Sequence, residues 1–203
     1  MMNFRGKFEG FVFYKNILIL LRGSALAQFI PLLISPLIAR LYSPQEFGVL
    51  ALFTSISTIF GSVINGRYEQ ALVLVESEKE AKHVTILSIL ISFIASIFLF
   101  IIFILSGNFI LSFLNIEELN FWFYFIPFVV FSIGVFNTLN FYHLRQKSFK
   151  TISNSEVSRS SSFAVIQLVF PFFKNGLYGL MIGKLISSFV APLYLLQKTK
   201  LNF

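Results

Sequence analysis

Six apolar stretches, each close to the length needed to cross a lipid bilayer, dominate this sequence and limit what it can fold into. A membrane-spanning helix needs about 20 consecutive, mainly apolar residues. The stretches cover residues 17–41, 47–75, 84–105, 121–144, 157–173 and 177–196. They predict an all-α, polytopic membrane helix bundle of six transmembrane helices that forms a single transmembrane domain, residues 1–203.

The composition agrees with a membrane protein. Hydrophobic residues make up 56% of the chain and charged residues only 12%, whereas soluble domains carry about 25% charged residues. There is no cysteine, which excludes disulfides, thiolate metal sites and cysteine nucleophiles. The apolar run that begins near Ile17 is too long for a signal peptide and no A-x-A cleavage site follows it, so we expect it to be retained.

Glycine, proline and serine predict local features within three of the spans. Gly61 and the pair Asn65-Gly66 predict a break in the long second span. Pro127 predicts a kink in the fourth span. The serine-rich run of residues 158–162 opens the predicted fifth span and favours helix N-capping over a catalytic role.

Basic residues cluster on one side of the predicted spans. The net charge is +7, but the charges lie in short loops and at span ends, which argues against a nucleic-acid surface and fits the positive-inside rule. We therefore expect both termini to be cytoplasmic, with an even number of spans between them. The residues that set this orientation are Arg5, Lys7, Lys15, Lys79, Lys82, Arg145, Lys147, Lys150, Arg159, Lys198 and Lys200.

Two arginines lie inside apolar runs. Arg22 is about six residues past the start of the first span and Arg67 about nine before the end of the second, so both lie roughly 9–13 Å below the cytoplasmic surface. An arginine in hydrocarbon costs at least about 2.5–3.5 kcal/mol, so it should face a wet cavity or a partner. Its planar fork of donors matches phosphate oxygens, and two such cations at one depth suit a diphosphate. The alternative is that both side chains snorkel to the interface.

Three more charged residues are candidates for ion coupling or gating. Glu69 either takes up a proton or sodium ion during transport or forms an ion pair with Arg22. Arg40, at the outer end of the first span, is an outer gate, a cap of the helix C-terminus or the partner of Glu46 in an ion pair. Lys184, about eight residues into the sixth span, either faces a cavity or snorkels.

The sequence contains no pattern typical of a metal site or an enzyme. His83 and His143 are far apart, with no Cys or Asp anywhere in the chain to complete a metal site. Nucleophile-elbow, zinc-protease, phosphate-loop and dinucleotide motifs are absent from the sequence. We therefore expect no metal, no cofactor and no enzymatic activity.

Three segments together resemble the start of a known transporter family. They are Gly23-Ser-Ala-Leu-Ala-Gln28, Ser35-Pro-Leu-Ile-Ala-Arg-Leu-Tyr-Ser-Pro-Gln-Glu-Phe-Gly48 and Arg67-Tyr-Glu-Gln-Ala-Leu-Val73. The combination is similar to Wzx-type polysaccharide (O-antigen) flippases of the multidrug/oligosaccharidyl-lipid/polysaccharide exporter superfamily. The resemblance covers residues 20–85; the remainder matches in span pattern.

The resemblance implies a two-lobed bundle of about twelve helices around a cationic cavity. It implies transport of undecaprenyl-diphosphate-linked oligosaccharide across the bacterial cell (inner) membrane for O-antigen or capsule biosynthesis. Arg67 and Glu69 fall in the matched motif, and Arg22 lies just before it.

Six spans correspond to the N-terminal lobe alone, so we expect membrane lipid around the chain and either a second six-helix lobe or a homodimer as partner. The alternatives are a drug/cation antiporter of the same superfamily, a membrane-embedded glycan enzyme, or a fragment that does not transport.

Overall fold

The prediction of an all-α membrane bundle is confirmed. The computed structural model describes residues 4–113, 116–172 and 176–199, with side chains described from Leu18 onward except that of Glu117. The described residues contain no strand. Five of their helices are long and apolar enough to cross a membrane. The elements are α1 (Phe4–Leu41), α2 (Pro44–Val63), η1 (Tyr68–Val73), α3 (Glu78–Phe113), η2 (Glu117–Phe125), α4 (Ile126–Arg145), α5 (Phe149–Val169), η3 (Phe170–Phe172) and α6 (Gly176–Lys198).

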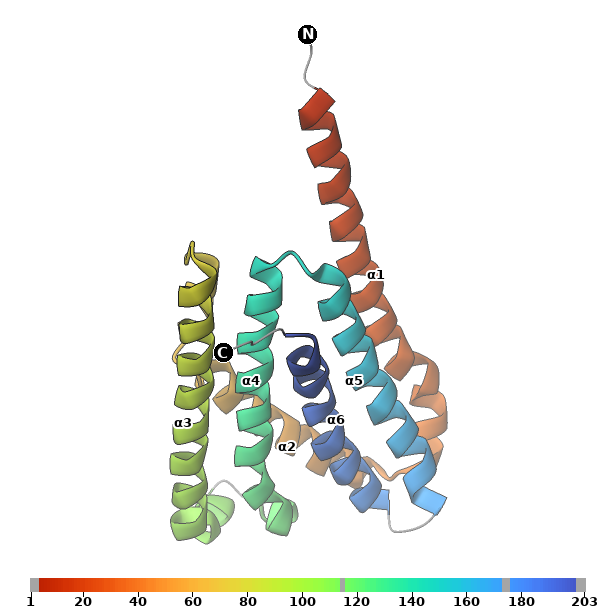
Figure 1. The fold of residues 1–203 in the computed structure, drawn as a ribbon. Coiled ribbons are helices and arrows are strands. Elements are labelled where there is room, and N and C mark those ends of the chain that lie inside the picture. The colour runs from red at the N-terminus through yellow and green to blue at the C-terminus, as the bar shows by residue number, and fades with distance from the viewer. Residues whose placement is uncertain (1–3, 114–115, 173–175, 200–203) are drawn as a thin grey trace.

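Successive long helices run in alternating directions between two ends of the bundle (Figure 1). We call these the Arg145 end, where α4 finishes, and the Tyr42 end, where α1 finishes. The N-terminal end of α1 and the C-terminal end of α6 both point towards the Arg145 end (Figure 1). Helix α4 packs against α2, α3 and α6, whereas α1 packs mainly against α5. Helices far apart in the sequence therefore build the α1–α5–α6 side of the molecule.

Helix α5 differs from the predicted fifth span. It covers Phe149–Val169 rather than 157–173, and it is not among the five helices that are apolar enough to span on composition alone. Its 21 residues are nevertheless about 31 Å long. Ser153, Ser155 and Gln167 are buried against other helices, so the polar face of α5 points into the bundle rather than towards lipid.

The capping role predicted for the serine run is wrong. The run of residues 158–162 lies in the middle of α5, and the N-cap position is Ser148, whose side chain makes no capping hydrogen bond. The prediction failed because the run was placed at the start of an apolar segment, whereas the helix begins at Phe149, earlier in the chain.

The predicted break in the second span is confirmed. Helix α2 ends at Val63, Gly66 and Arg67 have positive φ angles of 57° and 62°, and the chain continues as η1. Asn65 is buried at this break, with 3% of its surface exposed. Its side chain makes four hydrogen bonds, to Ser88 Oγ, Ser92 Oγ, the Gly134 carbonyl and Thr138 Oγ1.

The predicted kink at Pro127 is wrong. Pro127 lies in the first turn of α4, where a missing backbone N–H costs no intrahelical hydrogen bond. The irregular backbone comes earlier, in η2, where Asn120 has a φ of 39°. Helix α3 also extends beyond the predicted 84–105, from Glu78 to Phe113.

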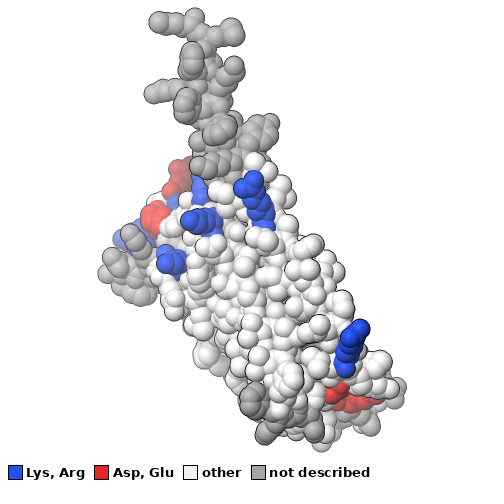
Figure 2. Space-filling view, turned by 90° about the vertical axis from the view of Figure 1, so that its right-hand side faces the viewer, with Lys and Arg blue, Asp and Glu red and all other residues white. Residues whose placement is uncertain are grey.

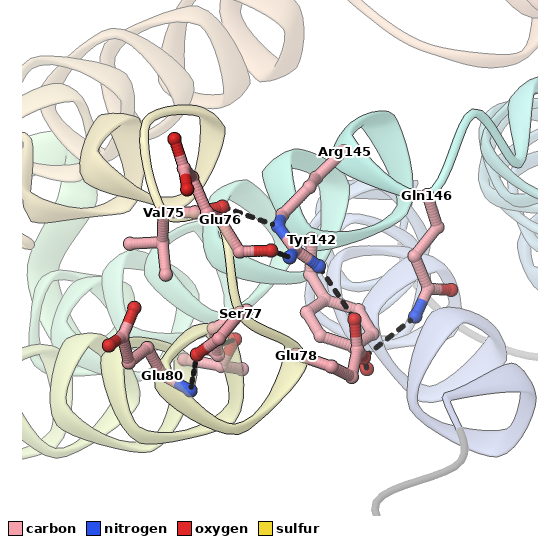
Figure 3. A network of polar contacts seen from close by, with 10 residues as sticks. Val75, Glu76, Ser77, Glu78, Glu80, Tyr142, Arg145 and Gln146 are labelled. Atoms are coloured by element: carbon pink, nitrogen blue, oxygen red, sulfur yellow. Dashed lines mark hydrogen bonds and ion pairs between the residues drawn. The ribbon is translucent and has the colours of Figure 1, made fainter.

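A polar clamp holds the η1–α3 connection against the end of α4 (Figure 3). The Arg145 guanidinium donates hydrogen bonds to the carbonyls of Val75, at 3.1 Å, and Glu76, at 2.9 Å. It also forms a 2.6 Å ion pair with Glu78, which accepts a 2.7 Å hydrogen bond from the Tyr142 hydroxyl. One side chain therefore fixes three points of the connection.

Tyr42 joins α1 to α5 at the opposite end of the bundle. Its buried hydroxyl donates a 2.7 Å hydrogen bond to the Gln167 carbonyl. Burial, helped by the nearby Glu46 carboxylate, raises the pKa of Tyr42 to about 12, so the hydroxyl stays protonated and able to donate.

Candidate functional site

A polar cavity of about 330 Å³ lies between α4, α5 and α6. Pro31 of α1 and Thr58 of α2 complete its wall. The other lining residues are Ser132, Ile133, Phe136, Asn137, Arg159, Ser160, Phe163, Lys184, Ser187 and Ser188. This lining holds two cations and no acidic residue, which suits an anion.

The two cations are at similar depth in the bundle. Arg159 lies ten residues before the end of α5 at Val169, and Lys184 lies eight residues after the start of α6 at Gly176. At about 1.5 Å per residue, they are roughly 15 and 12 Å from the Tyr42 end. Both charges therefore lie far from either end of their helices, where they need a polar partner or a wet cavity.

Arg159 is held by two neighbours. Its Nη2 forms an ion pair with the Glu156 carboxylate, one turn earlier on α5. Its guanidinium carbon lies 5.2 Å from the ring centroid of Phe136, within cation–π distance. The side chain is still 41% exposed, so the guanidinium is oriented by these neighbours but remains open to the cavity.

The hydroxyls near Lys184 are largely occupied by the backbone. Ser187 and Ser188 each donate to the Lys184 carbonyl, and Ser132 donates a 2.6 Å hydrogen bond to the Ser188 carbonyl across the α4–α6 contact. Within the described part of the chain the Lys184 ammonium has no ion pair. It is therefore the cation most free to receive an anion.

Of the site residues predicted from sequence, Lys184 lines this cavity, whereas Arg22 and Arg67 do not. Arg22 is exposed on α1, beside the contact of Gly23 with Ser153 of α5. Arg67 is exposed at the start of η1, an element that packs on α3 and α4. The two arginines thus belong to different parts of the bundle, and their role in substrate binding stays a prediction.

The remaining candidates also lie outside the cavity. Glu69 on η1 is 4% exposed, and its Oε2 has no hydrogen-bond partner among the described residues. Among the described residues, Glu69 forms no ion pair with Arg22, and Arg40 forms none with Glu46. Arg40 is exposed near the Tyr42 end, while Glu46 bonds to Ser43 in a capping box.

Figure 2 shows charged side chains near the two ends of the α1–α5 side, with an uncharged band between them.

Sequence reasoning missed Arg159, because the predicted fifth span began at Val157 and left this residue near the cytoplasmic loop. One available signal was the spacing of Glu156 and Arg159, since oppositely charged residues three positions apart are neighbours on a helix.

The described residues hold no cluster of His, Cys, Asp or Glu that could bind a metal ion. What the cavity offers chemically is fixed positive charge and hydrogen-bond donors for a phosphate-like group.

Comparison with known proteins gives one match. A family model described as "Polysaccharide biosynthesis protein" matches residues 37–202, which include every residue of the cavity except Pro31. No curated protein and no solved structure matches the chain.

Proposed function

Because the chain belongs to the polysaccharide biosynthesis protein family, we propose that it translocates undecaprenyl-diphosphate-linked oligosaccharide across a bacterial cytoplasmic membrane, as a Wzx-type flippase. The transported glycan would serve O-antigen or capsule synthesis. The family match supports a role in polysaccharide synthesis or export, and the apolar helices support a multi-pass membrane protein. The flipping step itself is our proposal.

The observation that carries this proposal is the pairing of Arg159 and Lys184 in one cavity without an acidic lining residue. A diphosphate esterified at both ends carries two negative charges, which two cations balance. The N–H donors of Arg159 that Glu156 does not engage suit phosphate oxygens, and Lys184 adds a compact charge. A cationic drug would be repelled by the same two charges, so this cavity favours the flippase over the drug antiporter.

The arrangement of the helices suggests how the chain sits in the membrane. The basic residues that set the positive-inside prediction, and the ends of α1 and α6, favour placing the Arg145 end in the cytoplasm. We further propose that the translocation path is completed by a second six-helix lobe or by a second copy of the chain. Arg22 and Arg67 would then contact the diphosphate before or after it occupies the Arg159–Lys184 cavity.

Complementation tests the proposal. The chain is expressed with the rest of its glycan gene cluster in a host lacking its own flippase, and surface polymer and intracellular lipid-linked repeat units are quantified. We expect surface polymer with the native chain, and its loss with Arg159→Ala and Lys184→Ala at unchanged membrane abundance. Lys79→Ala, an exposed cation at the start of α3 and outside the cavity, is the matched control. Normal surface polymer from the Arg159→Ala/Lys184→Ala double variant would reject the cavity as the diphosphate site.

A further inference from the structure

We propose that Glu156 regulates the affinity of the cavity by competing with the substrate diphosphate for Arg159. This inference rests on the proposed function, because it concerns how the same cavity holds and releases its anion. The starting observation is that the Glu156 carboxylate binds the Arg159 guanidinium but is not part of the cavity lining. The Glu156 carboxylate is therefore an anion of the protein itself, next to a cavity that we propose binds the diphosphate of the substrate.

The contacts of Arg159 leave room for this competition. Only Nη2 is engaged by Glu156, and a guanidinium has five N–H donors. The cation–π contact with Phe136, 5.2 Å from the guanidinium carbon to the ring centroid, uses no N–H donor. A phosphate oxygen can therefore reach the free donors first and then displace the carboxylate from Nη2.

The exposure of the pair also favours exchange rather than a permanent structural bond. The side chains of Arg159 and Glu156 are 41% and 24% exposed, so the ion pair is only partly buried. Breaking a fully buried ion pair leaves an uncompensated charge at high cost. A partly exposed pair with a three-residue spacing on one helix is worth little by itself, so an anion with two charges can replace it.

A transporter gains from such a competitor because it must release what it binds. Two unopposed cations in one cavity would hold a diphosphate more tightly than a pair in which one cation is already bound to a carboxylate. With Glu156 present, the carboxylate returns to Arg159 as the diphosphate leaves, so the guanidinium is never left without an anion. Glu156 is thus an affinity-determining residue that acts through Arg159, and not a group that must touch the substrate.

Binding of a soluble prenyl diphosphate tests this assignment. The full chain is reconstituted in nanodiscs, and the Kd for farnesyl diphosphate is measured by calorimetry for wild type, Glu156→Gln, Arg159→Ala, Lys184→Ala and the Glu156→Gln/Arg159→Ala double variant. We expect Glu156→Gln to lower the Kd by about tenfold, because the competing charge is removed at nearly constant shape. The effect should vanish in the Arg159→Ala background. Glu80→Gln, an exposed acid at the start of α3, is the matched control.

The outcomes separate the two proposals. If wild type binds and Arg159→Ala or Lys184→Ala weakens binding, but Glu156→Gln leaves the Kd unchanged or raises it, the competition is rejected and the cavity assignment stands. If Glu156→Gln tightens binding equally with and without Arg159, the effect is not transmitted through Arg159 and the proposal is also rejected. If none of the cavity variants changes the Kd, both proposals fall. Glu156→Ala repeats the comparison should the glutamine variant be poorly folded.

Discussion

The side-chain amide of Asn65 donates a 2.9 Å hydrogen bond to the backbone carbonyl of Gly134, which joins the break after α2 to the middle of α4. The same amide group bonds to Thr138 Oγ1, at 2.8 Å, and to Ser88 Oγ, at 3.2 Å. The other end of the side chain accepts a 2.7 Å hydrogen bond from Ser92. One buried residue thus satisfies polar groups on two helices, and the chain reverses to η1 around it.

Replacing Asn65 should therefore destabilise the bundle strongly. Asn65→Ala removes four hydrogen bonds, each worth about 0.5–1.5 kcal/mol net, while Ser88, Ser92, Thr138 and the Gly134 carbonyl keep hydrogen bonds to one another. We therefore expect a total loss of about 2–4 kcal/mol in the free energy of unfolding. SDS titration in detergent measures it. Asn154→Ala, which removes a 3.3 Å contact of an exposed side chain with Tyr194, should change it by less than about 0.5 kcal/mol. Equal effects of the two variants would contradict a special role for Asn65.

The contact of α1 with α5 depends on the absence of a side chain at Gly23. A Cβ atom added there would lie 1.7 Å from Ser153 Oγ and 2.5 Å from Ser153 Cβ, closer than real Cβ atoms come. Gly23→Ala should push the two helices apart and cost about 1–3 kcal/mol. Thermal unfolding in detergent would show this as a lower midpoint.

Two variants act as controls for the Gly23 prediction. Gly48→Ala adds the same methyl group where nothing lies within 4 Å, and it should leave the midpoint unchanged or raise it. Combining Gly23→Ala with Ser153→Gly removes the clashing hydroxymethyl group and should recover part of the loss, because neighbouring substitutions are coupled. Failure of the double variant to recover would mean that α1 does not pack on α5 at this point.

The sequence predicts lipid-facing helices well and buried polar helices poorly. In α3, Ile94 and Phe98 are 59% and 65% exposed on the outer surface, and such residues produce the continuous hydropathy that marks a span. In α5, Ser153 and Ser155 are buried against other helices, so the first two turns of the helix, before the predicted span at 157–173, resemble a loop when only hydropathy is considered. Arg159 was missed for the same reason. The break at Asn65 was predictable because Asn-Gly is a local turn signal, whereas its four partners come from distant helices.

The clamp around Arg145 should control the mobility of the η1–α3 connection. Arg145→Lys keeps the charge, but an ammonium group cannot reach the Val75 carbonyl, the Glu76 carbonyl and the Glu78 carboxylate in the fork geometry of a guanidinium. We expect faster hydrogen–deuterium exchange in residues 64–77 for both Arg145→Lys and Arg145→Ala, with little change in α5 and α6. Lys198→Ala, at the exposed end of α6, should leave this exchange unchanged. Uniformly faster exchange over all helices would point to global destabilisation instead of release of a clamp.

Arg67 is a predicted substrate contact and also has an unfavourable backbone conformation. The substitution Arg67→Gly distinguishes the two roles, because it removes the charge and relieves the backbone. Its φ of 62° is in the left-handed region, which glycine adopts more easily than arginine. Arg67→Gly should therefore preserve or raise stability, by up to about 1 kcal/mol, while removing the charge.

If the guanidinium contacts the diphosphate, Arg67→Gly lowers surface polymer in the complementation assay although membrane abundance is unchanged or higher. Arg67→Lys, which keeps the charge but not the bidentate fork, should retain an intermediate level. Full surface polymer with Arg67→Gly would show that the transport cycle does not use the charge of Arg67, and would leave Arg22, Arg159 and Lys184 as the candidate cations for the substrate.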